Sequence, residues 1–334
     1  MRIAVVRNYD HTGVINRFGH HPSPEEYDNR RTVEDVVTAL HEGGHETLLC
    51  EGDKGLLATL ERFMPPDPQA RPSGIVFNMA YGIQGEHRST HVPAMLEMAG
   101  VPYTGSSPLG HGLALDKVLA KRLLREGGVP TPNFRVMRRG TEGTGHLRFP
   151  LVVKSRFEEC SLGLQLVHEP AQLKQAVEGI VMQYGQDALV EEYIEGREIY
   201  VALLGNEDLE VLPLVERDFG DRETRLYTWE DKQNITGAEP PTICPVQIGS
   251  SLGTMLRDVS IATFRTCQCR DFARVDLRID RFGNPFVLEI NALPEISRRS
   301  TYALAARTAG HSYSSMVNHI LDVAHTRYFG IGIV

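Results

Sequence analysis

Two short segments of the chain, residues 274–279 and 285–291, alternate apolar with polar or charged residues. Such alternation predicts β-strands with one buried face, and the Gly and Asn among residues 281–284 favour a four-residue hairpin loop. A loop of this length sets the register of the two strands, which puts Asp276 opposite Glu289. Facing carboxylates repel each other, so an antiparallel hairpin with this register needs positive charge beside it.

The two faces of this hairpin differ in residue type. Its second strand has three apolar residues on one face: Phe286, Leu288 and Ile290. Val287 lies on the other face with the polar residues, where the same register sets Arg274 opposite Asn291. Two carboxylates and an amide oxygen form an all-oxygen ligand set that suits Mg²⁺ bound to phosphates. A solvated charged face, neutralised by its own arginines, also explains the pattern, and periodicity does not decide between the two.

The composition argues against several classes of protein. The 334 residues carry 35 Lys and Arg against 43 Asp and Glu, and the formal charge of −8 offers nucleic acid or an anionic membrane no surplus of positive charge. The five cysteines are scattered without a CxxC pair, and the N-terminus lacks the pattern of a signal peptide. No apolar run reaches the roughly 18 residues that span a bilayer. We expect a cytoplasmic protein with reduced thiols that binds neither nucleic acid nor membrane.

Strand and helix patterns alternate in the first third of the chain. The strand patterns lie at residues 3–6, 45–50, 74–78 and 101–105, and the helix patterns at 32–40 and 92–99. This alternation predicts a doubly wound α/β domain over residues 1–111. After it we expect a central domain over residues 112–187 and a C-terminal domain over residues 188–334. In the C-terminal domain, strands dominate until a closing helix that begins near Tyr302 and breaks near Gly310.

Several polar residues stand at the ends of these predicted elements. Lys117 opens a helix and Lys154 ends a strand, so both ammonium groups can project into a cleft, although isolated lysines usually lie on the surface. A polar loop of small residues, 155–163, follows Lys154 and is suited to lie over phosphates. An apolar strand delivers Glu191, and a turn then delivers Glu198. Carboxylates at these points can accept hydrogen bonds from an adenine amino group and from ribose hydroxyls.

Taken in order, the motifs resemble those of the ATP-grasp ligases, and most closely the D-alanine–D-alanine ligase family. The segments that carry the resemblance are PYTGS at 102–106, LDK at 115–117, PLVVK at 150–154, VEEYIEGRE at 190–198, ARVD at 273–276 and LEIN at 288–291. The resemblance covers about residues 75–325. It implies a three-domain ATP-grasp fold: a Rossmann-like α/β N-terminal domain, a small central ATP-grasp subdomain and an α+β C-terminal ATP-grasp subdomain. ATP lies between the last two.

The resemblance also implies which residues bind ATP. It assigns the phosphates to Lys117, Lys154, Lys232 and the small-residue loop with Ser161. It assigns Glu191 and the backbone of Tyr193 and Ile194 to the adenine, and Glu198 to the ribose. The expected cofactors are therefore ATP and divalent cations.

Further roles concern metal binding and catalysis. The family pattern places two Mg²⁺ ions, for which Mn²⁺ can substitute, on Asp276, Glu289 and Asn291. It matches Arg274 to the arginine that stabilises an oxyanion, and Ser300 to the serine that holds the carboxylate of the second amino acid. In this family the γ-phosphoryl group of ATP passes to a substrate carboxylate, and an amine attacks the resulting acyl phosphate. The order and spacing of the motifs favour the metal site over a solvated charged face.

The sequence departs from the family pattern at positions that face the amino-acid substrates. The family's N-terminal Gly-Gly pair and glutamate are missing from residues 7–16, its His-Gly dipeptide is Tyr81-Gly82, its Gly-Ser-Ser loop is Glu159-Cys160-Ser161, and its ω-loop tyrosine is Gln233. Arg298 and Arg299 precede Ser300, where they either bind an extra anionic group of the second substrate or form a solvated basic turn.

These departures favour a ligase whose substrates are not, or not only, two D-alanines. We expect an ATP-dependent carboxylate–amine ligase that joins amino acids or small peptides, releases ADP and phosphate, and serves specialised peptide or natural-product biosynthesis. The first alternative is a D-alanine–D-alanine ligase of peptidoglycan synthesis. An alternative of another class is a catalytically silent ATP-binding sensor, which has no need of the oxyanion donor Arg274. The resemblance also implies a homodimer.

Overall fold

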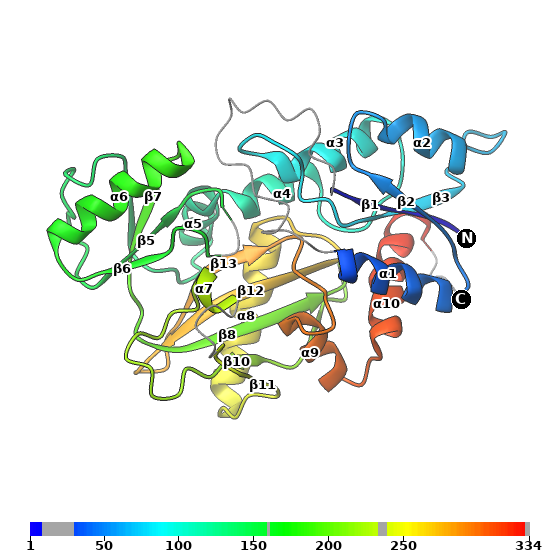
Figure 1. The fold of residues 1–334 in the computed structure, drawn as a ribbon. Coiled ribbons are helices and arrows are strands. Elements are labelled where there is room, and N and C mark those ends of the chain that lie inside the picture. Colours follow the sequence, from blue (N-terminus) through cyan, green and yellow to red (C-terminus); the bar gives the residue numbers. More distant parts are fainter. Residues whose placement is uncertain (9–29, 159–160, 233–238, 331–334) are drawn as a thin grey trace.

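The computed structural model describes residues 1–8, 30–158, 161–232 and 239–330, and Figure 1 draws the others as a thin grey trace. Three of the departures from the family pattern fall outside the described residues. They are most of the N-terminal loop, the Glu159-Cys160 pair and Gln233. Within the described residues the strands form three sheets.

The N-terminal sheet is parallel, with strand order β2-β1-β3. Strands and helices alternate along its sequence: β1 (Arg2–Arg7), α1 (Arg30–Glu42), β2 (Glu46–Glu51), α2 (Leu56–Phe63), β3 (Gly74–Asn78), the 3-10 helix η1 (Arg88–Thr90) and α3 (His91–Met98). β1 is buried on both faces, since Ile3 and Val5 join one core cluster while Ala4 and Val6 join another. The prediction of an α/β fold in this part of the chain is confirmed.

The prediction of a strand at residues 101–105 is wrong. In this segment Tyr103 forms one isolated parallel bridge with Val76. Pro102 has no N–H to donate to a ladder, and Gly105 takes a left-handed φ of 96° that turns the chain away. The backbone therefore leaves the edge of the sheet directly after the bridge.

Two short helices, α4 (Pro108–Leu115) and α5 (Lys117–Glu126), connect the N-terminal sheet to the next one. Asp116 stands between them and caps α5, because its carboxylate accepts hydrogen bonds from the N–H groups of Val118 and Leu119, both at 3.1 Å. This cap fixes Lys117 as the first residue of α5. The prediction that Lys117 opens a helix is thereby confirmed.

The second sheet is antiparallel, with strand order β4-β7-β5-β6. Its elements are β4 (Phe134–Met137), β5 (Leu151–Ser155), β6 (Gln165–Val167), α6 (Pro170–Tyr184) and β7 (Ala188–Glu192). Helix α6 covers one face of this sheet, at the left of Figure 1. Because β7 pairs with β4 and β5, it belongs with this sheet, although it lies beyond the domain boundary expected at residue 187. The division into domains itself stays a prediction.

The third sheet is built around β8, with strand order β11-β10-β8-β12-β13 and β9 also paired with β8. Its elements are β8 (Gly196–Leu204), β9 (Glu210–Val211), β10 (Val215–Arg217), α7 (Trp229–Lys232), β11 (Thr242–Ile243), α8 (Ser250–Thr266), β12 (Phe272–Asp280) and β13 (Pro285–Asn291). Helix α8 contradicts the expectation that strands dominate this part of the chain. It buries Leu256, Ser260 and Phe264, which recur at helical spacing, and it packs on β8, β12 and β13.

The chain closes with α9 (Thr301–Thr308) and α10 (Tyr313–Phe329). The predicted break falls between them, at Gly310, which has a φ of 99°. Helix α10 packs against α1 of the N-terminal part, as Figure 1 shows at the right of the molecule. Side chains of Ser314 and Asn318 donate hydrogen bonds to the Ala39 carbonyl at 3.2 and 2.8 Å. None of the helices in the described residues is long and apolar enough to cross a membrane.

Candidate functional site

The hairpin of β12 and β13, which carries Asp276 and Glu289 and is called the acidic hairpin below, has the register that the sequence predicts at its charged residues. β12 and β13 pair with Asp276 opposite Glu289 and with Arg274 opposite Asn291. The four residues between Asp280 and Pro285 form the loop, as expected. Two carboxylates from neighbouring strands are therefore held on one face of the sheet, beside an amide and a guanidinium.

The same hairpin contains a β-bulge that the alternating pattern does not show. The register shifts between Asp276 and Leu277, so that Leu277 pairs with Val287 and Leu288 is an extra residue in β13. Val287 consequently lies in the core cluster with Leu277 and Ile290. The expectation that Val287 shares a face with the polar residues is wrong, because a bulge resets the alternation of faces.

Basic side chains neutralise the two facing carboxylates. Arg274 donates hydrogen bonds to both carboxylate oxygens of Asp276, from Nε at 2.6 Å and from Nη2 at 2.7 Å. Asn291 Nδ2 donates to the same carboxylate at 3.3 Å. Lys117 Nζ lies 3.8 Å from the Glu289 carboxylate. The repulsion that the register implies is thus relieved by the chain's own cations, which hold the acids in place.

Glu289 is the more strongly ionised of the two acids. Burial by itself would raise the pKa of its carboxyl group. The positive charges of Lys117, Lys154, Lys232 and Arg274 outweigh that cost and lower the pKa to about 2. Glu289 is therefore an anion throughout the physiological range, in the state that a metal ligand requires.

A buried ion triad lies beside this hairpin. Glu191, only 2% exposed, accepts from Lys154 Nζ at 2.6 Å and lies 2.8 Å from Lys121 Nζ. Burial by itself would raise the pKa of Glu191, but the two ammonium groups outweigh it and lower the pKa. The structure therefore brings together Lys154 and Glu191, which the sequence assigns to opposite ends of ATP.

Lys121 is a site residue that the sequence analysis missed. It is 1% exposed, and its Nζ also donates to Thr131 Oγ1 at 2.8 Å. The signal was present in the sequence, because a residue four positions after Lys117 in a helix lies on the same face. An ammonium group buried at this depth implies a fixed anionic partner, which Glu191 supplies.

Glu198 lies on β8 and is held from two sides. Tyr200 Oη donates to its carboxylate at 2.6 Å, and Arg278 Nη1 lies 3.4 Å away. Arg278 also donates to the Gly196 carbonyl at 2.9 Å. These contacts fix the start of β8 against Arg278 of the neighbouring strand β12. Burial raises the pKa of Glu198 despite the nearby charge of Arg278.

The expected adenine hinge, Tyr193 and Ile194, forms the connection between β7 and β8. The Tyr193 N–H donates to the Pro150 carbonyl at 3.1 Å, and its hydroxyl donates to the Arg225 carbonyl at 3.3 Å. The backbone of Tyr193 thereby connects the hinge to the second sheet. Its N–H is already used for that purpose.

Three further predicted residues come from separate elements. Ser161 adopts a left-handed φ of 60° and accepts a backbone hydrogen bond from Leu164 N–H at 3.2 Å. Lys232 ends α7, and its charge contributes to the lowered pKa of Glu289. Ser300 Oγ accepts a hydrogen bond from the Ala303 N–H at 3.1 Å and so caps α9. Its hydroxyl proton is left to donate elsewhere.

A second buried network, also missed from the sequence, joins the N-terminal part to the loop after β5. Arg88 of η1 and Glu158 are both 3% exposed, and their charged groups lie 3.4 Å apart. Gln186 Nε2 donates to the same carboxylate at 2.6 Å, and Lys117 Nζ donates to the Glu158 carbonyl. The predicted phosphate ligand Lys117 is therefore positioned from both sides of the cleft.

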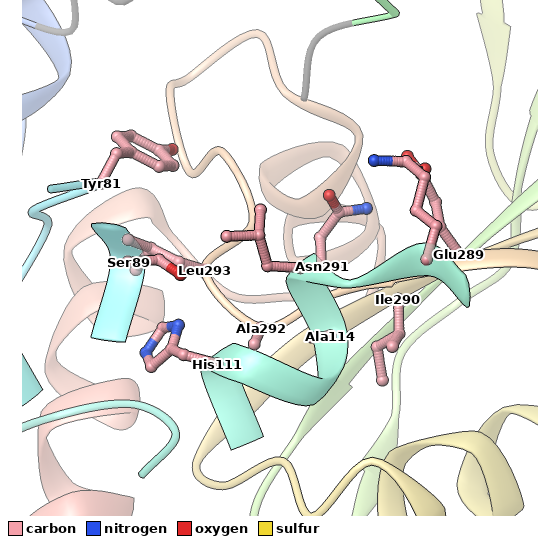
Figure 2. Close-up of a pocket in the computed structure, with 11 residues that line it drawn as sticks. Tyr81, Ser89, His111, Ala114, Glu289, Ile290, Asn291, Ala292 and Leu293 are labelled. Carbon is pink, nitrogen blue, oxygen red and sulfur yellow. The ribbon is translucent and has the colours of Figure 1, made fainter. Parts of the chain in front are cut away.

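A pocket opens beside the acidic hairpin. Figure 2 shows Glu289 and Asn291 on one side of it and Tyr81, Ser89 and His111 on the other. Burial lowers the pKa of His111 to about 4, so this imidazole is neutral at pH 7. Among the described residues its Nε2 has no hydrogen-bond partner. The pocket thus offers a neutral imidazole, a phenol and a hydroxyl next to the acids.

Arg298 has a role within the fold. Its Nε donates to Asp35 of α1 at 2.8 Å, and its guanidinium lies 4.3 Å from the centroid of the Tyr313 ring. The reading of Arg298 as a ligand for an anionic substrate group is therefore not supported, because its charge is already paired across the junction with α1. Arg299 is exposed.

The chain is similar to one protein family and to several known proteins. The family model described as "D-ala D-ala ligase C-terminus" matches residues 123–322. A protein of Sinorhizobium fredii named "Uncharacterized protein y4sG" is 68% identical over 336 residues, with 100% of both chains covered. The D-alanine–D-alanine ligase of Moorella thermoacetica is 30% identical, covering 91% of this chain and 96% of its own. That of Bordetella pertussis is 31% identical, covering 89% and 93%.

A solved structure matches the whole fold. It is the D-alanine–D-alanine ligase of Bacillus anthracis complexed with ATP, which aligns with a TM-score of 0.75 over 97% of each chain at 23% identity. The three sheets described above are therefore arranged as in that protein. The ATP-grasp fold expected from the sequence is confirmed.

Proposed function

Since the chain belongs to the D-alanine–D-alanine ligase family of ATP-grasp ligases, which form carbon–nitrogen bonds, we propose that it joins the carboxylate of an amino acid or small peptide to an amine. The main support is the set of Asp276, Glu289, Asn291 and Arg274 on one face of the hairpin. Asp276 is buried and the other three are half-buried, and Glu289 and Asn291 line the pocket of Figure 2. A solvated charged strand would not need that burial or the paired cations.

ATP is expected to bind across the cleft between the second and third sheets. Lys117, Lys154 and Lys232 all lie close enough to Glu289 for their charges to lower its pKa, so they are available to neutralise phosphates together with the Ser161 loop. We assign Glu191 to the adenine and Glu198 to the ribose hydroxyls. Because the N–H of Tyr193 is occupied, Ile194 is the residue of the hinge whose N–H should meet the adenine.

The ligand set fits divalent cations of the magnesium type. Asp276, Glu289 and Asn291 offer oxygen donors alone, and a carboxylate that already accepts two hydrogen bonds from Arg274 has further lone pairs for a metal. Two Mg²⁺ ions, or Mn²⁺ in their place, would neutralise charge on the phosphates when bound. Lys117 and Arg274 hold the carboxylates in position and limit their repulsion.

The chemistry needs activation of the carboxylate, because an oxide is too poor a leaving group for an amine to displace at neutral pH. A carboxylate oxygen attacks the γ-phosphorus of ATP, the bond to the β-phosphate oxygen breaks, and ADP and an acyl phosphate form. The amine then attacks the acyl carbon, and phosphate leaves with the original carboxylate oxygen. We assign Arg274 to stabilise the oxyanion of that tetrahedral intermediate, and loss of such a donor costs about 2.7 to 4 kcal/mol.

We further propose that the acid substrate, the amine substrate or both differ from D-alanine, as in specialised peptide biosynthesis. Tyr81 supports this, since it places a phenol in the lining of the pocket where the family pattern has a histidine. A D-alanine–D-alanine ligase of peptidoglycan synthesis is the second candidate, and the relatives at about 30% identity favour it. A homodimer, as in similar ligases, is expected and can be tested by light scattering.

The experiment is ADP and phosphate release with Mg²⁺ across a panel of D- and L-amino acids and short peptides, with products identified by mass spectrometry. Release with another acid and amine but not with D-alanine supports the first candidate. Release with D-alanine alone, giving the dipeptide, supports the second. ATP binding without release from any pair would contradict both and favour the sensor.

A further inference from the structure

A second cluster of metal-ligating side chains lies outside the ligase site. Glu210 of β9, His311 between α9 and α10, and His319 of α10 each offer one ligand atom, and these three atoms lie within 4.8 Å of one another. His311 Nε2 is 4.0 Å from the Glu210 carboxylate, and the two imidazole centroids are 5.5 Å apart. We propose that this cluster binds a divalent transition-metal ion, with Zn²⁺ as the first candidate.

The local structure orients these ligands before any ion arrives. Ser315 and His319 lie four residues apart on one face at the start of α10, and His311 lies just before that helix. His311 Nδ1 is hydrogen-bonded to Ser315 Oγ at 3.2 Å, which leaves Nε2 directed at Glu210. A ring whose second nitrogen is fixed in this way is the usual arrangement for a metal-binding histidine.

The ligand types decide which ion fits. Two imidazole nitrogens and one carboxylate oxygen suit Zn²⁺ and similar ions, whereas Mg²⁺ prefers oxygen ligands alone. Zinc bonds of about 2.0 to 2.2 Å in tetrahedral geometry place ligand atoms roughly 3.3 Å apart. The 4.0 Å between His311 Nε2 and the Glu210 carboxylate therefore needs to shrink by less than about 1 Å. Side chains that are partly exposed can make that movement by rotation, and water can take the fourth position.

This cluster is separate from the acidic hairpin. Glu210 pairs with Leu204 of β8, whereas Asp276 pairs with Tyr200 on the opposite edge of the same strand. Four residues of strand correspond to about 13 Å, so one ion cannot serve both groups. The cluster can therefore be loaded or removed without changing the ligands of the ligase site.

A metal here would join two parts of the fold. Glu210 belongs to the third sheet, and His319 belongs to the helix that packs on α1 through Ser314 and Asn318. An ion shared by Glu210 and His319 fixes α10 to the sheet while its other side holds α1. Binding to the folded chain alone raises the melting temperature. We infer a structural ion that stabilises the junction with the N-terminal sheet.

The test is zinc binding by calorimetry on the full chain, with Mg²⁺ in excess to occupy oxygen-rich sites. The parent should bind one more equivalent of Zn²⁺ than His319→Ala binds. Glu210→Gln should raise the Kd of that additional equivalent at least tenfold. His168→Ala is the matched control, because His168 is an exposed histidine that directly follows β6 of the second sheet. It should bind as the parent does. Equal zinc stoichiometry in the parent and His319→Ala would overturn the proposal.

A second measurement needs no substitution. Diethyl pyrocarbonate modifies accessible imidazoles, and mass spectrometry of peptides locates the modified residues. Zn²⁺ should protect His311 and His319 while leaving His168 as reactive as before. Unchanged modification of His311 and His319 in saturating Zn²⁺ would also overturn the proposal, whatever the variants do.

Discussion

Replacement of Glu191 by glutamine tests whether the buried triad is an ionic unit. Glu191→Gln keeps the shape of the side chain but leaves the ammonium groups of Lys154 and Lys121, now 2.6 and 2.8 Å from a carboxylate oxygen, without an anion. Breaking a buried ion pair in this way costs about 3 to 5 kcal/mol. With an m-value of about 3 kcal/mol/M, the urea midpoint should fall by roughly 1 to 2 M.

Urea unfolding can be followed in one part of the molecule by tryptophan fluorescence, because the chain has a single tryptophan. Trp229 packs against the core of the second sheet, which contains β5 and β7, so its fluorescence reports the unfolding of that sheet. Glu178→Gln is the matched control, since Glu178 pairs with Lys174 on α6 at 3.9 Å with both side chains 54% exposed. It should change stability by less than about 0.5 kcal/mol. Equal urea midpoints for Glu191→Gln and Glu178→Gln would refute the reasoning.

Three further predictions concern the site. Asp276→Asn and Glu289→Gln should each abolish turnover while circular dichroism stays unchanged, because each removes a carboxylate charge from the proposed metal site and no apolar core group. Turnover in both variants would contradict the metal assignment. Lys154→Ala should raise KM for ATP more than KM for the amine, and an effect confined to the amine would move Lys154 away from the phosphates. The pKa of His111 is about 4 in the folded chain, below the ordinary value of about 6.5. As the pH falls from 6.5 to 4, the unfolded chain takes up the proton before the folded chain does. The free energy of unfolding should therefore fall by about 3 kcal/mol over this range. The free energy of unfolding of His111→Gln, measured by urea unfolding, should fall less over the same pH range. An equal fall in parent and variant would contradict this prediction.

Local patterns were enough for the three strands of the N-terminal sheet and for the charged register of the hairpin. Alternation and a four-residue loop correctly paired Asp276 with Glu289, although the bulge at Leu288 moved Val287 to the other face. An alternating pattern does not show a bulge, because the extra residue Leu288 keeps the alternation in sequence and only the pairing with β12 reveals it. Helix α8 itself was missed since β-branched residues and a glycine N-cap weaken its local signal.

The candidate site was predictable where its residues sit in recognisable motifs. Lys117, Glu289 and Asn291 come together as the resemblance implies. The partners of these residues were not predictable, because contacts such as Lys121 with Glu191 and Arg88 with Glu158 join distant segments whose meeting depends on the arrangement of the three sheets. Propensity and periodicity describe single elements, and they carry no information on such pairings.

The most direct test of the ligase chemistry uses the acid substrate found by the activity panel, labelled with ¹⁸O in both carboxylate oxygens. Attack of that carboxylate on ATP followed by attack of the amine leaves one ¹⁸O in the released phosphate and one in the new amide. We predict this distribution, measured by mass spectrometry of phosphate and product. Formation of ADP and product with no ¹⁸O in the phosphate would contradict an acyl phosphate at this site.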